Sequence, residues 1–320
     1  MPDKEYKIDF GLDSDKNYLD DGRQSANLKK GSVDKTGAAK YGKKQNMFGS
    51  YVADLQEDLK KFNIKDVGDA DGDFGNNTLK AVKEFQMASQ CTLRDLDETP
   101  QELPSITMSS DVDGIVGEKT KSEIKLWKDN NYKSPWGTLY PVPLIKQTYQ
   151  LSCWAASIQM LHKYNGKNTS QEELAKIAGI RDMNTDGGPR EQDMQALARR
   201  FGLEPIAPGN FDFGQWSQLL SDKGPLIITG LWYLDEGTPN EQKGSHTVLV
   251  TGASKNYAGS NYILINDPGG NYDLKTFEGF RKYIEDYSTN KDWDDYIKAH
   301  PAEKDRENAN RAYSIYYYKP

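Results

Sequence analysis

Apolar residues recur at helical spacing in three short segments of the first half of the chain. The first segment carries Val52, Leu55 and Leu59, and the other two follow Thr78 and Thr120. Apolar positions three or four residues apart lie on one face of a helix, where they can pack against a neighbour. Glycine-rich turns separate the segments, so the pattern predicts a small all-α bundle of three helices.

In the second half of the chain, helical spacing comes first and β-branched runs follow. Helices are expected at Cys153–Tyr164 and near 171–179, 191–201, 214–222 and 276–286, and strands near 225–232, 245–252, 261–266 and 312–318. Strands that follow one another through short turns pair in antiparallel fashion. Helices followed by an antiparallel sheet predict an α+β domain, with a cleft between the helices and the sheet.

Polar segments mark the expected boundaries between domains. We expect a polar arm at 1–45, partly disordered or lying on the bundle, and a helical domain at 46–130 with an inserted surface loop at 87–112. A linker at 131–140 then leads to the α+β domain at 141–320. A chain of 320 residues has room for two domains.

Composition and charge argue against several classes of partner. The net charge is −7, which disfavours nucleic acid and anionic membrane as partners. No apolar run approaches the length of a membrane span, and the first residues lack the basic and apolar blocks of a signal peptide. The two cysteines lie in different predicted domains, which argues against a structural disulfide.

No metal or cofactor is expected. The segment from Asp69 to Asp73 begins like a calcium loop, but Phe74 and Lys80 stand where such a loop needs glycine and glutamate. No two histidines stand at ligand spacing and no His-Glu-x-x-His sequence occurs, which argues against a zinc enzyme.

Cys153 stands at the start of an apolar helix, directly after Ser152, which is a good N-cap residue. A thiol there meets the positive end of the helix macrodipole, which favours the thiolate, the nucleophilic form of cysteine. The alternative is a buried core cysteine. Because a cysteine nucleophile needs a base within hydrogen-bond reach, its partners decide between the two interpretations.

Three histidines are available as the base, and His246 is the best placed. It opens a β-branched run, at the mouth of an expected strand from which it can project into a cleft. His162 lies on the Cys153 helix more than two turns away and is expected to be a polar residue on the helix flank. His300 lies in a polar stretch and is expected to be solvated.

An acceptor for the imidazole follows on the next expected strand. An antiparallel neighbour of the His246 strand would return Asn266 or Asp267 to the His246 end of the pair. Either side chain could then hold the imidazole by its Nδ1–H. Asp267 is followed by Pro268, and this dipeptide is also an ordinary turn signal. The residues alone leave open which of the two fills the third position of the site.

Four short motifs resemble those of papain-like cysteine peptidases. They are Gln147-x5-Cys153-Trp154-Ala155-Ala156, Gly224-Pro225-Leu226, Ser245-His246-x-Val248 and Asn266-Asp267-Pro268. The resemblance covers about residues 140 to 320 and fits the bacterial AvrRpt2-type and bacteriocin-leader-processing peptidases best. It implies Cys153 as the nucleophile, His246 as general base and acid, and Asp267 as the group that orients His246. It also implies Gln147 as an oxyanion-hole donor beside the Cys153 backbone N–H.

Two departures from the papain pattern concern the same motifs. Leu151-Ser152 precedes the cysteine where papain has Gly-Ser, and the third member is Asn266 or Asp267. Candidates for the walls of the cleft are Trp154, Trp216 and the turn Gly187-Gly188-Pro189. Core packing is the simpler interpretation of both tryptophans.

An internal repeat in the first half resembles a second family. Asp71-Gly72-Asp73-Phe74-Gly75-Asn76-Asn77-Thr78 returns as Asp113-Gly114-Ile115-Val116-Gly117-Glu118-Lys119-Thr120. With Leu55-Gln56 ahead of them, these motifs are similar to those of the peptidoglycan-binding domain fused to many bacterial wall hydrolases. The resemblance implies a peptidoglycan groove near the two turns. A helical spacer or docking module that no longer binds glycan is the alternative.

Together the motifs predict a cysteine hydrolase that cleaves an amide or peptide bond through a thioester acyl-enzyme. The expected substrate is a protein or peptide, and the alternatives are a peptidoglycan stem peptide, or deamidation or acyl transfer by the same residues. The expected setting is a bacterial effector exported without a classical signal peptide, with a secretion machine and an immunity or inhibitor protein as partners. A non-catalytic wall-binding or adaptor protein is the remaining alternative.

Overall fold

The computed structural model describes residues 27–33, 51–90, 112–186, 188–189, 191–207, 209–234, 242–257, 259–285 and 314–319. These residues divide into two compact units, one that ends at Ser134 and one that begins at Pro135. Each unit has its own buried apolar core.

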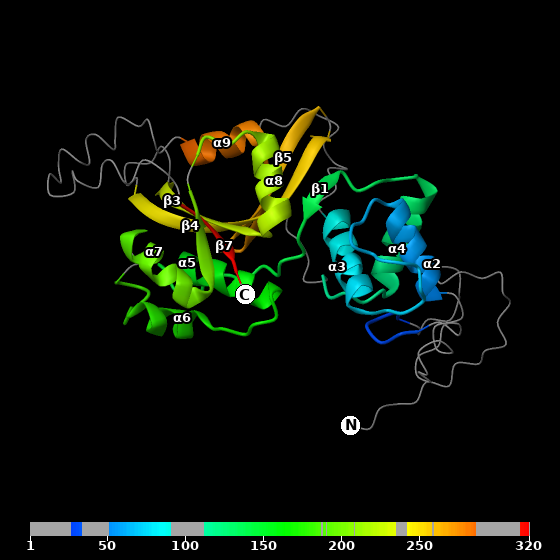
Figure 1. The fold of residues 1–320 in the computed structure, drawn as a ribbon, viewed down its shortest axis with the longest axis horizontal. Coiled ribbons are helices and arrows are strands. Elements are labelled where there is room, and N and C mark those ends of the chain that lie inside the picture. Colours follow the sequence, from blue (N-terminus) through cyan, green and yellow to red (C-terminus); the bar gives the residue numbers. More distant parts are fainter. Residues whose placement is uncertain are drawn as a thin grey trace, which may run out of the picture. The chain divides into compact units, whose positions relative to one another are not determined.

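The first unit contains the three helices predicted from the apolar spacing (Figure 1). They are α2 (Tyr51–Lys61), α3 (Asn76–Gln90) and α4 (Glu118–Asp129). Aromatic rings meet in its core, where the ring centroid of Phe85 lies 5.5 Å from that of Phe62 and 5.1 Å from that of Trp127. Ring pairs at such distances are favourable beyond the area that they bury. None of the three side chains is more than 2% exposed.

The internal repeat of the sequence is also a repeat in three dimensions. Gln56 of α2 and Gln86 of α3 each donate from Nε2 to an aspartate side chain, a main-chain carbonyl and a threonine hydroxyl, and each accepts a glycine N–H at Oε1. The partners of Gln56 are Asp71, Asp73, Thr78 and Gly72, and those of Gln86 are Asp113, Ile115, Thr120 and Gly114, with donor–acceptor distances of 2.8 to 3.2 Å. We refer to these sets as the first and second glutamine networks. Each network ties an Asp-Gly turn to the helix before it.

Residues 27–33, within the predicted polar arm, lie against both turns. Leu28 pairs with Val116, and Val33 pairs with Asp73, as isolated antiparallel bridges. Leu28 and Val33 are fully buried. This part of the arm therefore contributes two side chains to the core of the first unit.

The loop predicted at 87–112 begins later in the structure. Helix α3 continues to Gln90, and Met87 and Ala88 are fully buried in it. The boundary was placed too early because the apolar face does not stop at Phe85, since Ala88 follows it at helical spacing. Residues 91–111, which include Cys91, lie outside the described part of the chain.

The second unit is built on one antiparallel sheet, as predicted (Figure 1). Its strands are β1 (Trp136–Leu139), β2 (Leu203–Ile206), β3 (Leu226–Leu234), β4 (Gln242–Tyr257), β5 (Ser260–Asp267), β6 (Asn271–Thr276) and β7 (Ser314–Tyr318). Their order across the sheet is β2-β7-β3-β4-β5-β6, and β1 pairs with β4. Strand β4, which carries His246, is thereby central.

Helices cover both faces of this sheet. They are α5 (Cys153–Tyr164), α6 (Gln171–Ala178), α7 (Glu191–Ala198), α8 (Phe213–Lys223) and α9 (Phe277–Glu285), with a 3₁₀ turn η1 (Arg199–Phe201) after α7. Ile227 and Leu249 belong to one apolar cluster with α5 and α6, whereas Ile228 and Val248 belong to another with α8 and α9. Because neighbouring residues of a strand point to opposite faces, the two clusters lie on opposite sides of the sheet.

The two tryptophans considered as cleft walls belong to these two cores. Trp154 is 3% exposed and Trp216 is fully buried, each in a different cluster. Gly188 lies beside the Trp154 indole, where a β carbon would come within 2.8 Å of a ring carbon. Core packing is therefore the role that the structure gives to both tryptophans, while Gly187 lies outside the described residues.

Strands β1, β2 and β6 were not among the expected elements. The linker predicted at 131–140 was wrong in its second half, because β1 lies there and pairs with β4. Pro205 stands inside β2, and proline in a run normally argues against a strand because it cannot donate to the ladder. Strand β2 pairs only with β7 and forms an edge of the sheet, where proline is tolerated. Strand β6 follows β5 through a tight turn at Gly269 and Gly270 and pairs with it. The sequence of β6 is short and polar, so it does not reveal this pairing.

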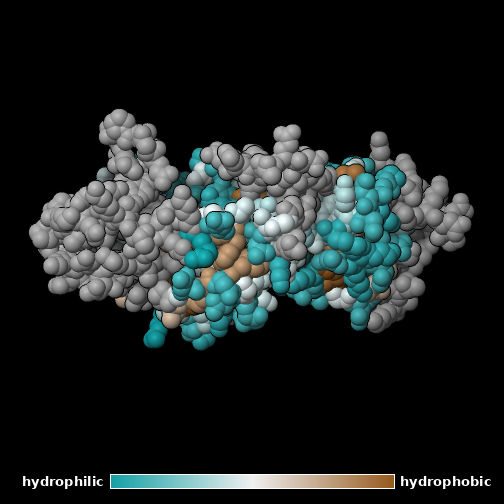
Figure 2. Space-filling view, turned by 90° about the horizontal axis from the view of Figure 1, so that it is seen from above, coloured by the Kyte–Doolittle hydropathy of each residue, from teal (hydrophilic) through white to brown (hydrophobic). Residues whose placement is uncertain are grey.

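On the face drawn in Figure 2, the described surface is mostly hydrophilic, and apolar residues reach it only in limited areas. None of the described helices is both long enough and apolar enough to cross a lipid bilayer.

Candidate active site

The start of α5 carries the candidate nucleophile. Cys153 is the first residue of this helix and is largely buried, with 9% of the residue exposed. The first N–H groups of a helix have no partner inside the helix, and their aligned dipoles give this end a partial positive charge. The position therefore suits an anionic sulfur.

Ser152 occupies the N-cap position of α5, but its side chain does not cap the helix. Its hydroxyl lies 2.8 Å from Oε1 of Gln171 and 3.0 Å from the carbonyl oxygen of Tyr149, and it accepts the Tyr149 N–H at 3.1 Å. Ser152 is therefore at the N-cap position, as expected, but its hydroxyl bonds to the loop before the helix and does not supply the cap.

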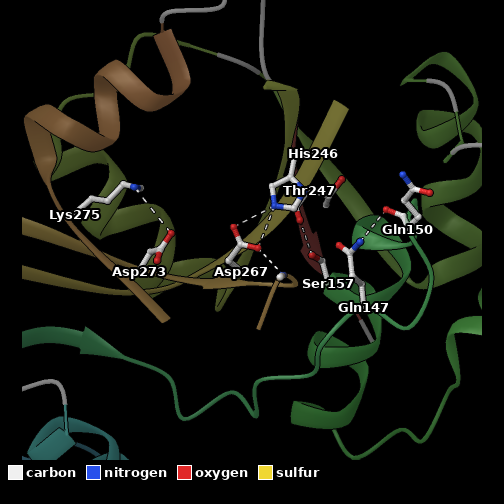
Figure 3. Close-up of polar contacts among 9 residues, drawn as sticks. Gln147, Gln150, Ser157, His246, Thr247, Asp267, Asp273 and Lys275 are labelled. Atoms are coloured by element: carbon white, nitrogen blue, oxygen red, sulfur yellow. Dashed lines mark hydrogen bonds and ion pairs between the residues drawn. The ribbon is translucent and has the colours of Figure 1, made fainter. Parts of the chain in front are cut away.

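His246 of β4 links the cysteine to Asp267 of β5. The expectation that His246 opens its strand was wrong, because β4 begins earlier, at Gln242. Its Nε2 atom lies 3.1 Å from each carboxylate oxygen of Asp267, and the imidazole also forms a hydrogen bond with the Cys153 side chain. Figure 3 shows the carboxylate pointing at the ring, with a further bond from the Gly269 N–H to Asp267 at 2.6 Å. The expected contact through Nδ1 was wrong, because the rotation of the ring presents Nε2 to the carboxylate. The structure thus brings together three of the four predicted site residues.

The register of the sheet explains why Asp267, and not Asn266, meets the imidazole. Leu249 of β4 stands opposite Asn266 of β5. Continued by one residue, this register places Asp267 opposite Val248, two residues from His246, so the carboxylate and the imidazole share a face of the sheet. Asn266 takes the other face, where its fully buried amide accepts from the Thr251 hydroxyl at 2.9 Å. The same amide donates to the carbonyl of Val142 at 3.1 Å.

Burial and charge act in opposite directions on the imidazole. Burial lowers the pKa of His246, but the hydrogen bonds and charges of Asp267 and Cys153 outweigh it and raise that pKa to about 10. Burial raises the pKa of Asp267, but the bond to His246 and the positive charge of Lys275 hold it below its ordinary value. At neutral pH the pair is therefore an imidazolium and a carboxylate.

A second carboxylate, which the sequence did not reveal, lies on the adjacent strand. Asp273 of β6 stands opposite Ile265 and so shares a sheet face with Asp267. Its pKa is raised by burial and by the negative charge of Asp267, while Lys275, 4.0 Å away, opposes the shift. The only sign of Asp273 in the sequence would have been its alternating position along a strand. No strand was expected where β6 lies, so this sign was missed.

Gln147 lies in the loop before α5, with its amide turned toward that loop. Its Nε2 atom donates to the carbonyl oxygens of Tyr149 at 3.1 Å and Gln150 at 2.9 Å. In the view of Figure 3, Gln147 and Asp267 lie on opposite sides of His246. The Gln147 N–H donates to the carbonyl of Pro268 at 2.8 Å, which ties this loop to the turn after Asp267.

Two further side chains that the sequence did not single out hold the parts of the site together. The buried hydroxyl of Ser157, one turn after Cys153, donates to the Thr247 carbonyl at 3.1 Å and so fixes α5 beside the His246 strand (Figure 3). Gln171 of α6 binds the loop that carries Gln147. These three bonds join residues distant in sequence, so only the folded chain reveals them.

The other two histidines stand apart from the site or beyond the described residues. His162 is 4% exposed, with Nε2 2.7 Å from the Phe201 carbonyl oxygen and Nδ1 2.9 Å from the Thr169 hydroxyl. It is therefore a buried, hydrogen-bonded residue of α5 whose ring nitrogens bond away from Cys153. Burial lowers its pKa. His300 lies outside the described residues. Within the described ranges, no group of three or more His, Cys, Asp or Glu side chains is arranged to hold a metal ion.

Comparison with known proteins finds two families, each matching a different part of the chain. Residues 138–288 match the family of the papain-like cysteine protease AvrRpt2, and residues 48–92 match a family described as a putative peptidoglycan-binding domain. No relative was found among curated proteins.

Two solved structures are similar to part of the chain. One is a double-glycine-motif protease from an AMS/PCAT transporter in complex with the leader peptide, with 25% identity over 44% of this chain and 84% of that one, at a TM-score of 0.29. The other is the peptidase domain of Streptococcus ComA, a bifunctional ABC transporter of a quorum-sensing pathway, with 20% identity over 43% and 89% and the same TM-score.

The assignment rests on the two family matches, and both agree with the families that the sequence motifs resemble. The chain therefore combines a papain-like cysteine peptidase domain of the AvrRpt2 family, which is a hydrolase domain, with a domain of the peptidoglycan-binding type.

Proposed function

We propose that the second unit cleaves a peptide bond through a thioester acyl-enzyme, with Cys153 as nucleophile and His246 as acid and base. The observation that carries this proposal is the position of His246, whose imidazole bonds both to the Cys153 side chain and to Asp267. An imidazolium beside a thiol favours the thiolate. Asp267 fixes the ring orientation and supports its positive charge. Because Asp267 takes Nε2, the Nδ1 atom is the nitrogen that faces the sulfur.

In the first half of the reaction, the Cys153 thiolate attacks the carbonyl carbon and the electron pair moves to the carbonyl oxygen. Expulsion of the amine restores the carbonyl as a thioester, and His246 gives the amine its proton. In the second half, neutral His246 takes a proton from water, whose oxygen attacks the thioester. Collapse releases the acid product and returns the thiolate and the imidazolium.

The oxyanion formed at each attack needs donors at the start of α5. We propose the Cys153 backbone N–H and the Gln147 side-chain amide for this role. The Gln147 amide donates to two loop carbonyls in this structure, so one of these bonds must give way to the substrate oxygen. Catalytic hydrogen bonds are commonly looser in the absence of substrate and tighten once it is bound. The substrate would lie in a cleft between α5 and the His246 end of the sheet.

A protein or peptide is the substrate class that the peptidase family supports best. The peptidoglycan-binding type of residues 48–92 supports a second candidate, hydrolysis of the stem peptides of peptidoglycan. The pairing of a peptidase with a wall-binding type of domain also supports export from a bacterial cell to the envelope or to a target cell. A secretion machine and an immunity or inhibitor protein are the partners proposed with that route.

The test compares wild type with Cys153→Ala on two substrates, a bacterial protein lysate and purified sacculi, each followed by mass spectrometry. New protein termini that appear only with wild type would support a protein peptidase, and new muropeptides would support a wall hydrolase. If neither substrate were cleaved, and Cys153 were alkylated no faster than in the unfolded chain, the proposed reaction would be contradicted. Fractionation of producing cells tests export, which recovery from the cytosol alone would contradict.

A further inference from the structure

A single glutamine side chain organises the loop that leads to Cys153. Gln171 is the first residue of α6 and is 3% exposed. Its Oε1 atom accepts the Thr148 N–H at 3.0 Å and lies 2.8 Å from the Ser152 hydroxyl. Its Nε2 atom donates to the Lys146 carbonyl at 3.1 Å and to Oε1 of Gln159 at 3.1 Å. A glutamine amide has two donor hydrogens and two acceptor sites, so all four are in use.

The partners of Gln171 are the neighbours of the two proposed oxyanion donors. Lys146 and Thr148 stand on either side of Gln147, and Gln171 binds the main chain of both. Ser152 directly precedes Cys153, and its hydroxyl lies against the same amide. One side chain therefore binds the backbone on either side of Gln147 and the Ser152 hydroxyl next to Cys153.

The helix that carries Gln171 is itself firmly held at this end. Ser170 caps α6 with a complete capping box, in which its hydroxyl accepts the Glu173 N–H and the Glu173 carboxylate accepts the Ser170 N–H. Leu174, one turn later, is fully buried in the core. A site is precise when the groups that support it stand on rigid elements, and the start of α6 meets that condition.

We propose that Gln171 is a positioning residue that sets the geometry of the oxyanion hole. This inference rests on the proposed function, because it assigns Gln171 the task of placing the Gln147 amide and the Cys153 N–H for that reaction. Gln171 acts through the loop 146–152 and does not itself touch the reacting atoms.

The inference is tested with Gln171→Met, which has a similar length and makes none of the four bonds, in the full-length protein. Gln171→Glu is a second variant that keeps both acceptors and loses both donors. Leu174→Val is the matched control, since it destabilises the same helix and leaves all four Gln171 bonds in place. The measurements are kcat and KM on a peptide cleaved by wild type, the thermal midpoint, and the rate at which iodoacetamide alkylates Cys153.

We expect Gln171→Met to lower kcat by roughly 10- to 100-fold, because a misplaced oxyanion donor costs catalysis on that scale. KM and the alkylation rate should stay within about 3-fold of wild type, since neither depends on the oxyanion hole. Gln171→Glu should lie between wild type and Gln171→Met, and it serves as the test if Gln171→Met does not fold.

A loss of kcat no larger than that of Leu174→Val at an equal thermal midpoint would overturn the inference and leave the proposed function standing. If Gln171→Met lowered the alkylation rate by the same factor as kcat, the inference would also be overturned, because the nucleophile itself would then be disturbed. Wild type that neither cleaves peptides nor reacts faster than unfolded chain would overturn the proposed function, and the inference with it.

Discussion

At the scale of single residues, the charge on Asp267 governs how the site titrates. The hydrogen bond and the negative charge of this carboxylate help to hold the pKa of His246 at about 10, well above that of a free histidine. The imidazolium is therefore present across the neutral range and is lost only as the pH rises toward 10. Any change that removes the carboxylate should move this limit to lower pH.

Asp267→Asn is expected to keep a hydrogen bond to His246 while removing the negative charge. We expect kcat/KM to fall by about 100-fold and the alkaline limb of its pH profile to move to lower pH. The profile of kcat/KM against pH measures both effects. Asp273→Asn is the control, since it removes the carboxylate that stands one strand farther from His246. An alkaline limb that stays in place in Asp267→Asn would contradict this account.

The sequence predicts the residues of the site better than their contacts. Cys153, His246 and Asp267 could be named because nucleophile, base and acceptor follow in a characteristic order. The choice between Asn266 and Asp267 needed the strand register, in which one residue decides the face of the sheet. The contact through Nε2 depends on the rotation of the imidazole, which no spacing in the chain specifies. The roles proposed for these side chains stay predictions until they are substituted.

At the scale of elements, the helices of the first unit carry a buried acid. Glu84 of α3 is 7% exposed and accepts the Lys65 N–H at 3.3 Å. Burial is the main cause that raises its pKa from 4.5 to about 7. A carboxyl group with a raised pKa holds its proton more tightly when folded than when unfolded. The folded state is therefore destabilised as the pH rises from about 4.5 through 7.

Glu84→Gln should remove this pH dependence. Between pH 4.5 and pH 8, wild type should lose up to about 3 kcal/mol of unfolding free energy relative to the variant, the upper limit for a shift of this size. Urea unfolding at both pH values, monitored by hydrogen exchange of peptides from α3, measures the difference in unfolding free energy between wild type and Glu84→Gln. Glu123→Gln, on α4, is the control. A constant difference between wild type and Glu84→Gln across this range would show that Glu84 does not titrate in it.

The glutamine networks predict a second effect at this scale. Gln86→Leu removes the amide that binds Asp113, Gly114, Ile115 and Thr120 in the second network. We expect it to destabilise the first unit by about 2 to 3 kcal/mol, the usual cost of several lost buried hydrogen bonds after partial rescue by water. Urea unfolding read by hydrogen exchange of α3 and α4 checks this. Lys80→Gln, an exposed change on α3, should stay within about 0.5 kcal/mol of wild type.

The elements that the sequence missed share a physical cause. Apolar spacing predicted the helices of the first unit and the central strands of the sheet, because those elements bury a regular face. Strand β2 was not predicted because Pro205 is acceptable only in an edge strand, and whether a strand lies at an edge depends on the whole sheet. Ser152 was assigned to capping because its neighbours in sequence allowed that role, whereas Gln171, far along the chain, takes its hydroxyl.

At the scale of the whole molecule, the two compact units predict two separable activities. Cys153→Ala changes a group in the second unit only and should abolish cleavage while leaving co-sedimentation with purified sacculi unchanged. Gln86→Leu changes a buried group in the first unit only and should weaken co-sedimentation while kcat on a short soluble peptide stays within about 2-fold. If both variants lost both activities, the units would not act independently.

The two glutamine networks also differ in how much chain they enclose. Gln56 and Asp71 are 15 residues apart and Gln86 and Asp113 are 27 apart, yet the amide-to-carboxylate distance is 3.0 Å in both. Loop-closure entropy grows only with the logarithm of length, so the longer span adds about 0.5 kcal/mol. A change in the number of residues between Gln90, where α3 ends, and Val112 should therefore alter the unfolding free energy of the first unit only slightly.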